Sequence, residues 1–367
     1  MEPIAVETLR TWLEEGRPVT ILDVRPANQR ADWAIPGSVH LDAYRALNEH
    51  DPHALDAAEV AGDAPVVTVC GAGKTSQLAA EQLTARGVPA LSLEGGMKAW
   101  SLAWNTAKVP LEDHSTRVIQ VRRTGKGCLS YLIGAGAEAF VIDASLDPQV
   151  YLDLAATYGW QITSVFDTHI HADHLSRSRQ LAERSGAMLF LPDQRRVSFP
   201  FTAMRDGDTF ATPQLRLTAL RTPGHTPEST CYLLNNALLF TGDTLFPTSI
   251  GRPDLHADEQ EARARSSLLY HSLHKLLALP SETLVLPGHA SQPVPFDGKP
   301  VGARLSEIDE QVGILHATQT VFVETLLKRL PPTPPNYERI VTLNEAGLVP
   351  DHDVTELEAG ANRCALS

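Results

Sequence analysis

Cysteines are few in this sequence, and long apolar runs are missing. The four cysteines (Cys70, Cys128, Cys231 and Cys364) are widely scattered over 367 residues and form no CxxC pair. That scatter suits a reducing compartment better than a disulfide framework. The first residues are acidic where a secretory signal needs bases, and no apolar run approaches the roughly 20 residues of a membrane span. We therefore expect a cytoplasmic protein with no membrane partner.

An excess of basic charge is also missing, because the formal net charge is -13. The protein has no overall positive field to offset its repulsion from nucleic-acid phosphates, which argues against a nucleic-acid partner. An anionic substrate would need local arginines. The apolar share of 43% and charged share of 20% are those of a globular protein, and the length favours two domains. The sequence has no internal repeats, and it leaves a homo-oligomer open.

The N-terminal part alternates short apolar strands with helices. We expect strands at residues 19–24 and 66–69 and a helix at residues 77–85. This alternation predicts an α/β domain with a mostly parallel sheet. In such a domain the functional loop lies at the carboxyl end of a strand. That loop begins at Cys70.

The Cys70 loop has the composition of an anion site. Gly71 and Gly73 let successive backbone N–H groups turn inward, and Lys74 adds a cation before the helix. Such dipoles lower the pKa of a thiol and favour a nucleophilic thiolate. A P-loop would need glycine five residues before Gly73, where Thr68 stands, so we reject a nucleotide-binding reading.

Four motifs in order give the N-terminal part a family resemblance. They are DVR at 23–25, IPGS at 35–38, the Cys70 loop, and EGGMKAW at 94–100. This set resembles a rhodanese (sulfurtransferase) domain over residues 1–105. The resemblance implies that Cys70 carries a sulfane sulfur as a persulfide, and that Gly71, Gly73 and Lys74 help to bind it. Residues 106–113 lack periodicity and contain Pro110, so we expect a linker there.

In residues 114–367, four short polar segments follow predicted strands. The first is THIHADH at 168–174, and the others follow strands near residues 222, 241 and 286. They supply metal-ligand side chains: His169, His171, Asp173, His174, His225, Asp243 and His289. A single histidine after a strand is usually a hydrogen-bonded surface or core residue. Four polar segments, each placed just after a strand, instead predict a metal centre. A closed structural site needs only four donors, whereas seven are present.

This ordered set is similar to the metallo-β-lactamase superfamily. The resemblance implies an αββα sandwich with metal between the loop ends. In the superfamily, one site uses the positions of His169, His171, His225 and Asp243. A second site uses Asp173, His174, His289 and a bridging Asp243. The sequence alone permits one metal or two.

Two activities within the superfamily compete. A persulfide dioxygenase would hold one Fe(II) on His169, His225 and Asp243, and would oxidise a thiol persulfide such as glutathione persulfide with O₂ to sulfite and thiol. His171, Asp173, His174 and His289 would then be outer-shell groups or an unused second site. A thioester hydrolase like glyoxalase II would instead use two metal ions, such as zinc, to generate hydroxide.

Several segments favour the dioxygenase. KGCLSYL at 126–132, GRPDL at 251–255 and the proline-rich 330–336 look like persulfide dioxygenase segments. Fusion to a sulfurtransferase also makes chemical sense for an enzyme that oxidises sulfane sulfur. Arg252 matches the family's arginine near the substrate, and Arg177 and Arg179 could supply further cations. We expect residues 175–185 to be helical and the apolar periodicity of 304–330 to serve packing.

Overall fold

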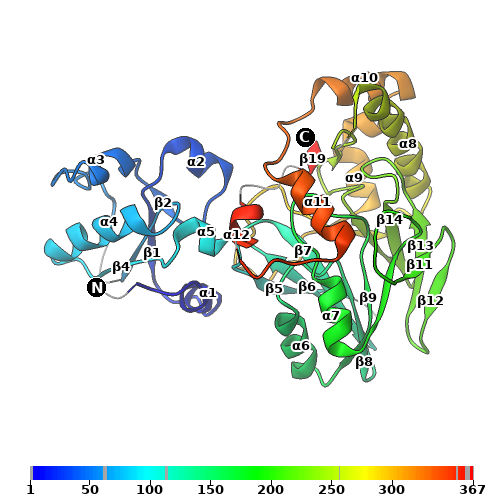
Figure 1. Ribbon diagram of the computed structural model, residues 1–367, viewed down its shortest axis with the longest axis horizontal. Coiled ribbons are helices and arrows are strands. Elements are labelled where there is room, and N and C mark those ends of the chain that lie inside the picture. The colour runs from blue at the N-terminus through cyan, green and yellow to red at the C-terminus, as the bar shows by residue number, and fades with distance from the viewer. Residues whose placement is uncertain are drawn as a thin grey trace.

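A computed structural model describes residues 3–60, 64–111, 115–255, 257–352, 354–359 and 364–366. Two bodies are visible in Figure 1, the blue to cyan N-terminal domain and the larger green to red C-terminal domain. Every helix in the described part of the chain is too short or too polar to cross a bilayer.

The N-terminal domain is built on a parallel sheet in the order β2-β1-β3-β4. Both faces of this sheet are covered by apolar clusters, which explains why its inner strands are continuous apolar runs. The predicted parallel α/β domain is confirmed. Its elements are α1 (Val6–Glu14), β1 (Thr20–Asp23), α2 (Ala27–Asp32), β2 (Val39–His40), α3 (Tyr44–Asn48), β3 (Val66–Val69), α4 (Lys74–Ala85), β4 (Ala90–Ser92) and α5 (Gly96–Trp100).

The C-terminal domain contains two large sheets. One has the order β11-β10-β9-β8-β7-β6-β5 and the other β12-β13-β14-β15-β17-β18. The strands are β5 (Asn105–Val109), β6 (Thr116–Arg123), β7 (Cys128–Ala135), β8 (Glu138–Ile142), β9 (Gln161–Phe166), β10 (Met188–Pro192), β11 (Thr202–Met204), β12 (Thr209–Ala211), β13 (Arg216–Arg221), β14 (Thr230–Leu234), β15 (Leu238–Gly242), β17 (Leu284–Pro287) and β18 (Ala303–Arg304). A small separate pair joins β16 (Ile250–Gly251) to β19 (Ala365–Leu366).

Three apolar layers hold the two sheets and their helices together. One cluster lies between the sheets and contains Tyr131, Phe166 and Phe240. A second joins the first sheet to its helices, and a third joins the other sheet to the helices on its far side. The predicted αββα sandwich is therefore confirmed. The helices are α6 (Pro148–Thr157), α7 (Ser178–Ser185), α8 (Glu259–Leu277), α9 (Leu305–Gln311), the 3-10 helix η1 (Gly313–His316), α10 (Gln319–Lys328), α11 (Tyr337–Ala346) and α12 (Val354–Leu357).

The segment predicted as a linker is in part a strand. Asn105–Val109 forms β5, which pairs antiparallel with β6 at the edge of the first sheet. Alternate residues of β5 are buried, because Asn105, Ala107 and Val109 face the protein. The irregular linker is thus shorter than expected. Residues 112–114 lie outside the described part of the chain, and the domain boundaries stay a prediction.

The helix expected at residues 175–185 begins only at Ser178. The backbone N–H groups of Leu175 and Ser176 donate instead to the side chains of Glu358 and Asn344, at 2.7 and 2.9 Å. These groups from the C-terminal region hold the preceding residues in a loop. Helices predicted from the periodicity of 304–330 are confirmed as α9, η1 and α10, which pack on the second sheet.

The two domains contact each other directly. Nε1 of Trp33 donates to the carbonyl of Thr124 at 3.0 Å, and Nε of Arg123 donates to the carbonyl of Ser101 at 2.8 Å. A Cβ on Gly127 would approach the Trp33 ring to 2.9 Å, so this contact requires glycine at residue 127. The terminal helix α12 lies beside α5 of the N-terminal domain (Figure 1).

A fully buried ion pair supports this junction. The guanidinium of Arg123 and the carboxylate of Glu358 lie 2.6 Å apart, and both side chains are 0% exposed. The other carboxylate oxygen of Glu358 accepts from the backbone of Leu175, close to the histidine-rich loop. Burial alone would raise the pKa of Glu358, but Arg123, Arg177 and His174 together outweigh it and the pKa is lowered.

We expect Glu358→Ala to cost about 3–5 kcal/mol of stability, because it leaves Arg123 buried without its partner. Glu356→Ala is the matched control. Glu356 pairs with Lys98 in an exposed ion pair, so its loss should cost at most about 1 kcal/mol. Denaturant unfolding at several pH values measures both. The lowered pKa means that the contribution of Glu358 is present above its unfolded pKa and is lost as the pH falls through the folded value. Equal effects of the two variants would contradict this assignment.

Candidate metal centre

Loops at the ends of four strands bring the seven predicted donors together. The histidine-rich loop follows β9, His225 follows β13, Asp243 follows β15 and His289 follows β17. All seven side chains are buried, with exposed fractions between 1% and 4%. A buried group of imidazoles and carboxylates is costly to desolvate unless something binds it.

Three of these donors form a group of their own. The ligand atoms of His169, His225 and Asp243 lie within 4.8 Å of one another. Oδ2 of Asp243 is 3.8 Å from Nε2 of His169 and 3.6 Å from Nε2 of His225. Within the described residues, Nε2 of His169 and Oδ2 of Asp243 are buried without a hydrogen-bond partner. Orphaned atoms that face one another fit a metal ion.

The tautomers of the two histidines are set by their other ring nitrogens. Nδ1 of His225 lies 2.8 Å from the carbonyl of Arg252, so it must carry the proton. Nδ1 of His169 lies 2.9 Å from the hydroxyl of Thr168, which itself donates to Asp143 and so accepts from the imidazole. In both rings the lone pair is therefore on Nε2, which faces Asp243.

The pKa shifts favour the metal-binding forms of the triad. Burial and the neighbouring His171 lower the pKa of His169 well below its ordinary value, and burial lowers that of His225. Burial alone would raise the pKa of Asp243, but the surrounding imidazoles, His289 first, bring it well below its usual range. Neutral imidazoles and an ionised carboxylate are the states in which these side chains bind metal.

The second oxygen of Asp243 is already engaged. Nδ1 of His289 lies 2.5 Å from Oδ1 of Asp243, so the carboxylate faces the triad through Oδ2 alone. A Cβ on Gly288 would lie 2.9 Å from the same oxygen, which shows how closely the backbone approaches it. Asp243 thus presents a single oxygen, Oδ2, to the two histidines.

In the Cys70 loop of the N-terminal domain, a backbone amide and a hydroxyl point at the thiol. The Cys70 sulfur accepts from the backbone N–H of Gly73 at 3.2 Å and from the hydroxyl of Ser76 at 3.3 Å. Gly73 has a φ of 86°, a left-handed conformation that favours glycine. Lys74 is exposed at the start of α4, and the carbonyl of Gly71 accepts from the backbone of Lys98.

Comparisons with known proteins match this geometry. Residues 123–289 match the model of the metallo-beta-lactamase superfamily, and residues 5–103 match that of the rhodanese-like domain. The chain joins a rhodanese-like domain to a metallo-β-lactamase superfamily domain.

Relatives of the metallo-β-lactamase domain include two hydroxyacylglutathione hydrolases. The protein from Rhizobium johnstonii is 38% identical over 151 residues, which are 40% of this chain and 56% of that protein. The protein from Brucella ovis is 31% identical over 155 residues, 41% of this chain and 54% of that protein. The chain thus spans little more than half the length of the curated relatives it matches.

Two solved structures share the fold of the metallo-β-lactamase domain. ETHE1 from Myxococcus xanthus is 31% identical, with a TM-score of 0.53 over 66% of this chain and 98% of that one. A metallo-beta-lactamase from Staphylococcus aureus is 25% identical, with a TM-score of 0.59 over 64% of this chain and 74% of that one.

The three arginines predicted to bind substrate have different surroundings. Arg252 is 0% exposed, and its guanidinium is bound to Asp254 and to the carbonyls of Pro331 and Pro332. Arg252 reaches the triad through its backbone carbonyl, which orients His225, and its role in substrate binding stays a prediction. Arg177 is buried beside Glu358 and Arg123, which places it in the interior of the metallo-β-lactamase domain.

Arg179 lies beside the histidine-rich loop, and its role in substrate binding stays a prediction. It lines a small cavity with His169 and His171, and it stacks on Phe199 at 4.9 Å. A larger cavity of about 400 Å³ is lined by His225 together with Arg196, Arg265 and Tyr337. Arg196, Arg265 and Tyr337 could not be predicted from the sequence, because they lie outside the metal motifs.

His171 lies beside the triad but contacts Asp143. Its Nε2 lies 3.3 Å from Oδ1 of Asp143, and its ring lies beside those of His169 and His174, with centroids 4.2 Å away in each case. It groups with Asp143 and Asp167 rather than with the triad. In the superfamily this position supplies a ligand of the first metal site. His171 must therefore move before it can bind a metal there.

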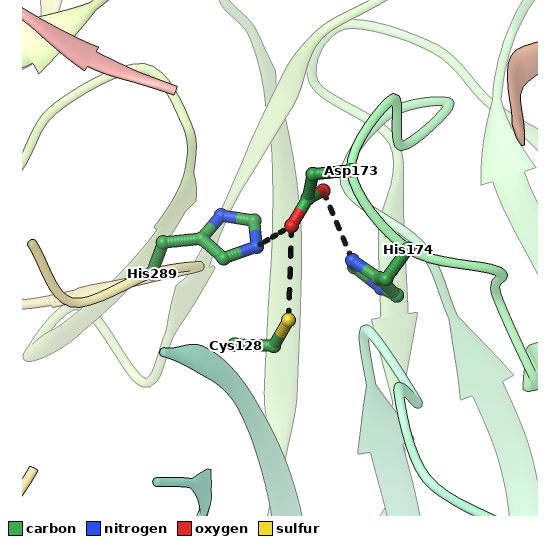
Figure 2. A group of neighbouring side chains, drawn as sticks. All are labelled: Cys128, Asp173, His174 and His289. Atoms are coloured by element: carbon green, nitrogen blue, oxygen red, sulfur yellow. Dashed lines mark hydrogen bonds and ion pairs between the residues drawn. The ribbon is translucent and has the colours of Figure 1, made fainter. Parts of the chain in front are cut away.

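Two cysteines that sequence reasoning left unassigned lie at the centre. Cys128 gathers with Asp173, His174 and His289, as Figure 2 shows. Burial opposes ionisation of the Cys128 thiol, but the imidazole of His174 lowers its pKa to about 6. Cys364 groups with Asp243 and His289, and burial raises the pKa of its thiol.

We expect Asp143→Asn to lower metal affinity roughly 10- to 100-fold, because outer-shell groups orient the ligands. Asp143 accepts from the backbone and hydroxyl of Thr168, which in turn fixes His169. Asn tolerates the positive φ of 56° at this residue, so the backbone should be retained. Asp147→Asn, at the exposed start of α6, is the control. Competition with a metal chelator measures the affinity, and equal affinities in the two variants would refute this role.

Proposed function

We propose that this protein is an iron-dependent persulfide dioxygenase with a fused sulfurtransferase domain. A low-molecular-weight thiol persulfide, O₂ and water give sulfite and the free thiol, so that sulfane sulfur is oxidised and O₂ is reduced. The metal-binding residues are His169, His225 and Asp243. Fe(II) bound there would supply the redox chemistry with O₂, as two histidines and one carboxylate do in non-haem iron oxygenases.

The observation that carries the proposal is the way in which Asp243 is held. One of its oxygens is bound by Nδ1 of His289, at 2.5 Å, and only the other faces the imidazoles. In a dinuclear hydrolase this carboxylate would bridge two metals, whereas here His289 occupies one of its oxygens. The arrangement found here favours a single metal with three protein ligands and open coordination positions.

The chain's own groups orient this site. The carbonyl of Arg252 holds His225, the Thr168 hydroxyl holds His169, and His289 holds Asp243. The surrounding side chains are buried, which limits access of water to reacting sulfur. A cavity of about 400 Å³ leading to His225 has the size of a small-molecule site.

The substrate class follows from the two domains together. The Cys70 loop provides amide and hydroxyl donors to a thiolate, which suits a sulfane-sulfur carrier. A carrier of this kind next to a sulfane-sulfur oxidase allows one sulfur species to serve both domains. The curated relatives are named for a glutathione thioester, so glutathione persulfide is the first substrate to test.

A second candidate function is hydrolysis of a glutathione thioester by two metal ions. It is favoured by the presence of all seven superfamily donors in one buried region and by the names of the relatives. It requires His289 to release Asp243.

The test is O₂ uptake and sulfite release by Fe(II)-loaded protein supplied with glutathione persulfide. We expect His225→Ala and Asp243→Ala to lose at least about 1000-fold of the activity, equivalent to about 4 kcal/mol. His274→Ala, on the exposed surface of α8, is the control and should retain activity. Hydrolysis of lactoylglutathione by protein with two zinc ions, without O₂ uptake, would overturn the proposal and favour the hydrolase.

A separate experiment tests the sulfurtransferase domain. We expect Cys70→Ser to abolish sulfur transfer from thiosulfate or a persulfide donor, because the serine hydroxyl is not a comparable nucleophile. Oxidation of added glutathione persulfide should be unchanged, since Cys70 lies outside the metal centre. Full sulfur transfer by Cys70→Ser would remove the catalytic role of this domain and leave it a docking role.

A further inference from the structure

A short segment late in the chain, residues 364–366, forms one wall of the metal centre. Its strand β19 pairs antiparallel with β16. Leu366 is 7% exposed and packs into the apolar cluster between the second sheet and its helices. Ala365 and His289 line the same cavity of about 240 Å³. The segment is therefore anchored in the fold beside the metal donors.

Strand β16 lies directly against the backbone of two triad residues. A Cβ added to Gly251 would overlap the carbonyl oxygen of Asp243 and would approach Cβ of His225 to 3.3 Å. The backbone N–H of Gly251 also donates to the carbonyl of Thr244 at 3.2 Å. Because no side chain separates β16 from Asp243 and His225, whatever holds β16 in place also holds these two residues.

The backbone of Cys364 reaches His225 through one other residue. The carbonyl of Cys364 accepts from the backbone N–H of Arg252 at 3.0 Å. The carbonyl of Arg252 lies 2.8 Å from Nδ1 of His225 and accepts from it. The backbone of Arg252 is thus held on one side by Cys364, and it orients the imidazole on the other.

The side chain of Cys364 reaches Asp243 directly. Its sulfur lies within 4.8 Å of ligand atoms of Asp243 and His289, and it makes a side-chain hydrogen bond to Asp243. In this pair the S–H group donates and the carboxylate accepts. Cys364 is 0% exposed, so water does not compete for the carboxylate there, and burial strengthens the bond.

We propose that Cys364 is a positioning residue of the metal triad, whose thiol orients Asp243 and whose carbonyl, through Arg252, orients His225. The inference rests on the triad of the proposed function, but it holds for either reaction considered there. Outer-shell partners fix the direction of a ligand's lone pair, so their loss weakens metal binding. Two of the three triad residues therefore depend on one residue that lies far along the chain.

A thiolate ligand is the competing role for this sulfur. Among the described residues, the mutually close atoms of the triad come from His169, His225 and Asp243, and the sulfur of Cys364 is outside that set. It groups with Asp243 and His289 instead. This placement favours a donor to the carboxylate over a ligand that shares the metal with both imidazoles.

Co²⁺ binding by metal-free full-length protein, measured in competition with a chelator, tests the role of the thiol. We expect Cys364→Ala to weaken binding at the triad roughly 10- to 100-fold, because it removes the donor to Asp243. Cys364→Ser keeps an O–H donor at nearly the same place and should restore most of the affinity. If the thiol served packing alone, serine would be no better than alanine in this buried position.

Cys231→Ala is the matched control for the loss of a buried thiol. Cys231 is also 0% exposed, and its sulfur lies 3.2 Å from the hydroxyl of Thr222. Within the described part of the chain it belongs to no group of metal donors. This variant should therefore lose stability and keep its affinity for Co²⁺.

Leu366→Asp tests the segment without changing the thiol. A carboxylate in the apolar cluster would expel β19, since a buried charge without a partner is costly. We expect the affinity for Co²⁺ to fall at least as far as in Cys364→Ala, and Cys364 to become reactive toward a thiol reagent. Val321→Asp is the control, because Val321 is 54% exposed on α10.

Equal affinities in Cys364→Ala and the wild type, or in the alanine and serine variants, would overturn the proposal. A thiolate-to-cobalt absorption that is lost in Cys364→Ser would do the same, because Cys364 would then be a ligand. If Cys364→Ala does not fold, unchanged affinity in Leu366→Asp with an accessible Cys364 would decide against it. Absence of O₂ uptake with these affinity differences intact would overturn the proposed function and leave the positioning role standing.

Discussion

The hydrogen bond between Asp243 and His289 determines how the buried centre is divided. It uses one carboxylate oxygen and one imidazole nitrogen, and each side chain then has a single donor atom left. The remaining oxygen of Asp243 faces His169 and His225, while the remaining nitrogen of His289 faces Asp173. The contact is possible because residue 288 is glycine, since a Cβ there would lie 2.9 Å from Oδ1 of Asp243. One interaction therefore separates two groups of side chains of metal-binding type that could otherwise share a carboxylate.

Residues far along the chain keep the histidine-rich loop in place. The amide of Asn344 donates to the carbonyls of His171 and His174, at 2.8 and 2.9 Å. Glu358 accepts from Leu175 and pairs with Arg123, which in turn contacts the rhodanese domain. The C-terminal region thus positions the loop as well as packing on the sheets. The metal centre and the domain junction consequently share the same buried polar contacts.

Much of the centre could be predicted because its residues follow strands in a repeated local pattern. His169, His225 and Asp243 each come shortly after an apolar run, and the ends of these strands, one in the first sheet and two in the second, meet at one edge of the sandwich. Cys128 could not be found in this way, because it starts a strand and reaches His289 only through a bridge between sheets. Arg252 matched a family position, yet its guanidinium is bound by Asp254, only two residues away.

The same reasoning explains which parts of the fold were predicted. Strands such as β3 and β9 are buried runs that local composition indicates. Helix α8, with 19 residues, was missed because its buried face is mixed with serine and arginine. Strand β5 was missed because five residues before Pro110 carry little pattern, and only pairing with β6 makes them a strand.

The pairing of strand β5 with β6 determines where a shortened chain can begin. It forms the edge of the seven-stranded sheet, although it precedes the region matched by the metallo-β-lactamase family. A shortened chain starting at residue 114 would leave the backbone groups of β6 unpaired along an open edge. Such an edge readily pairs with another molecule, which promotes aggregation. The smallest soluble catalytic fragment should therefore begin ahead of Asn105, inside the sequence of the neighbouring domain.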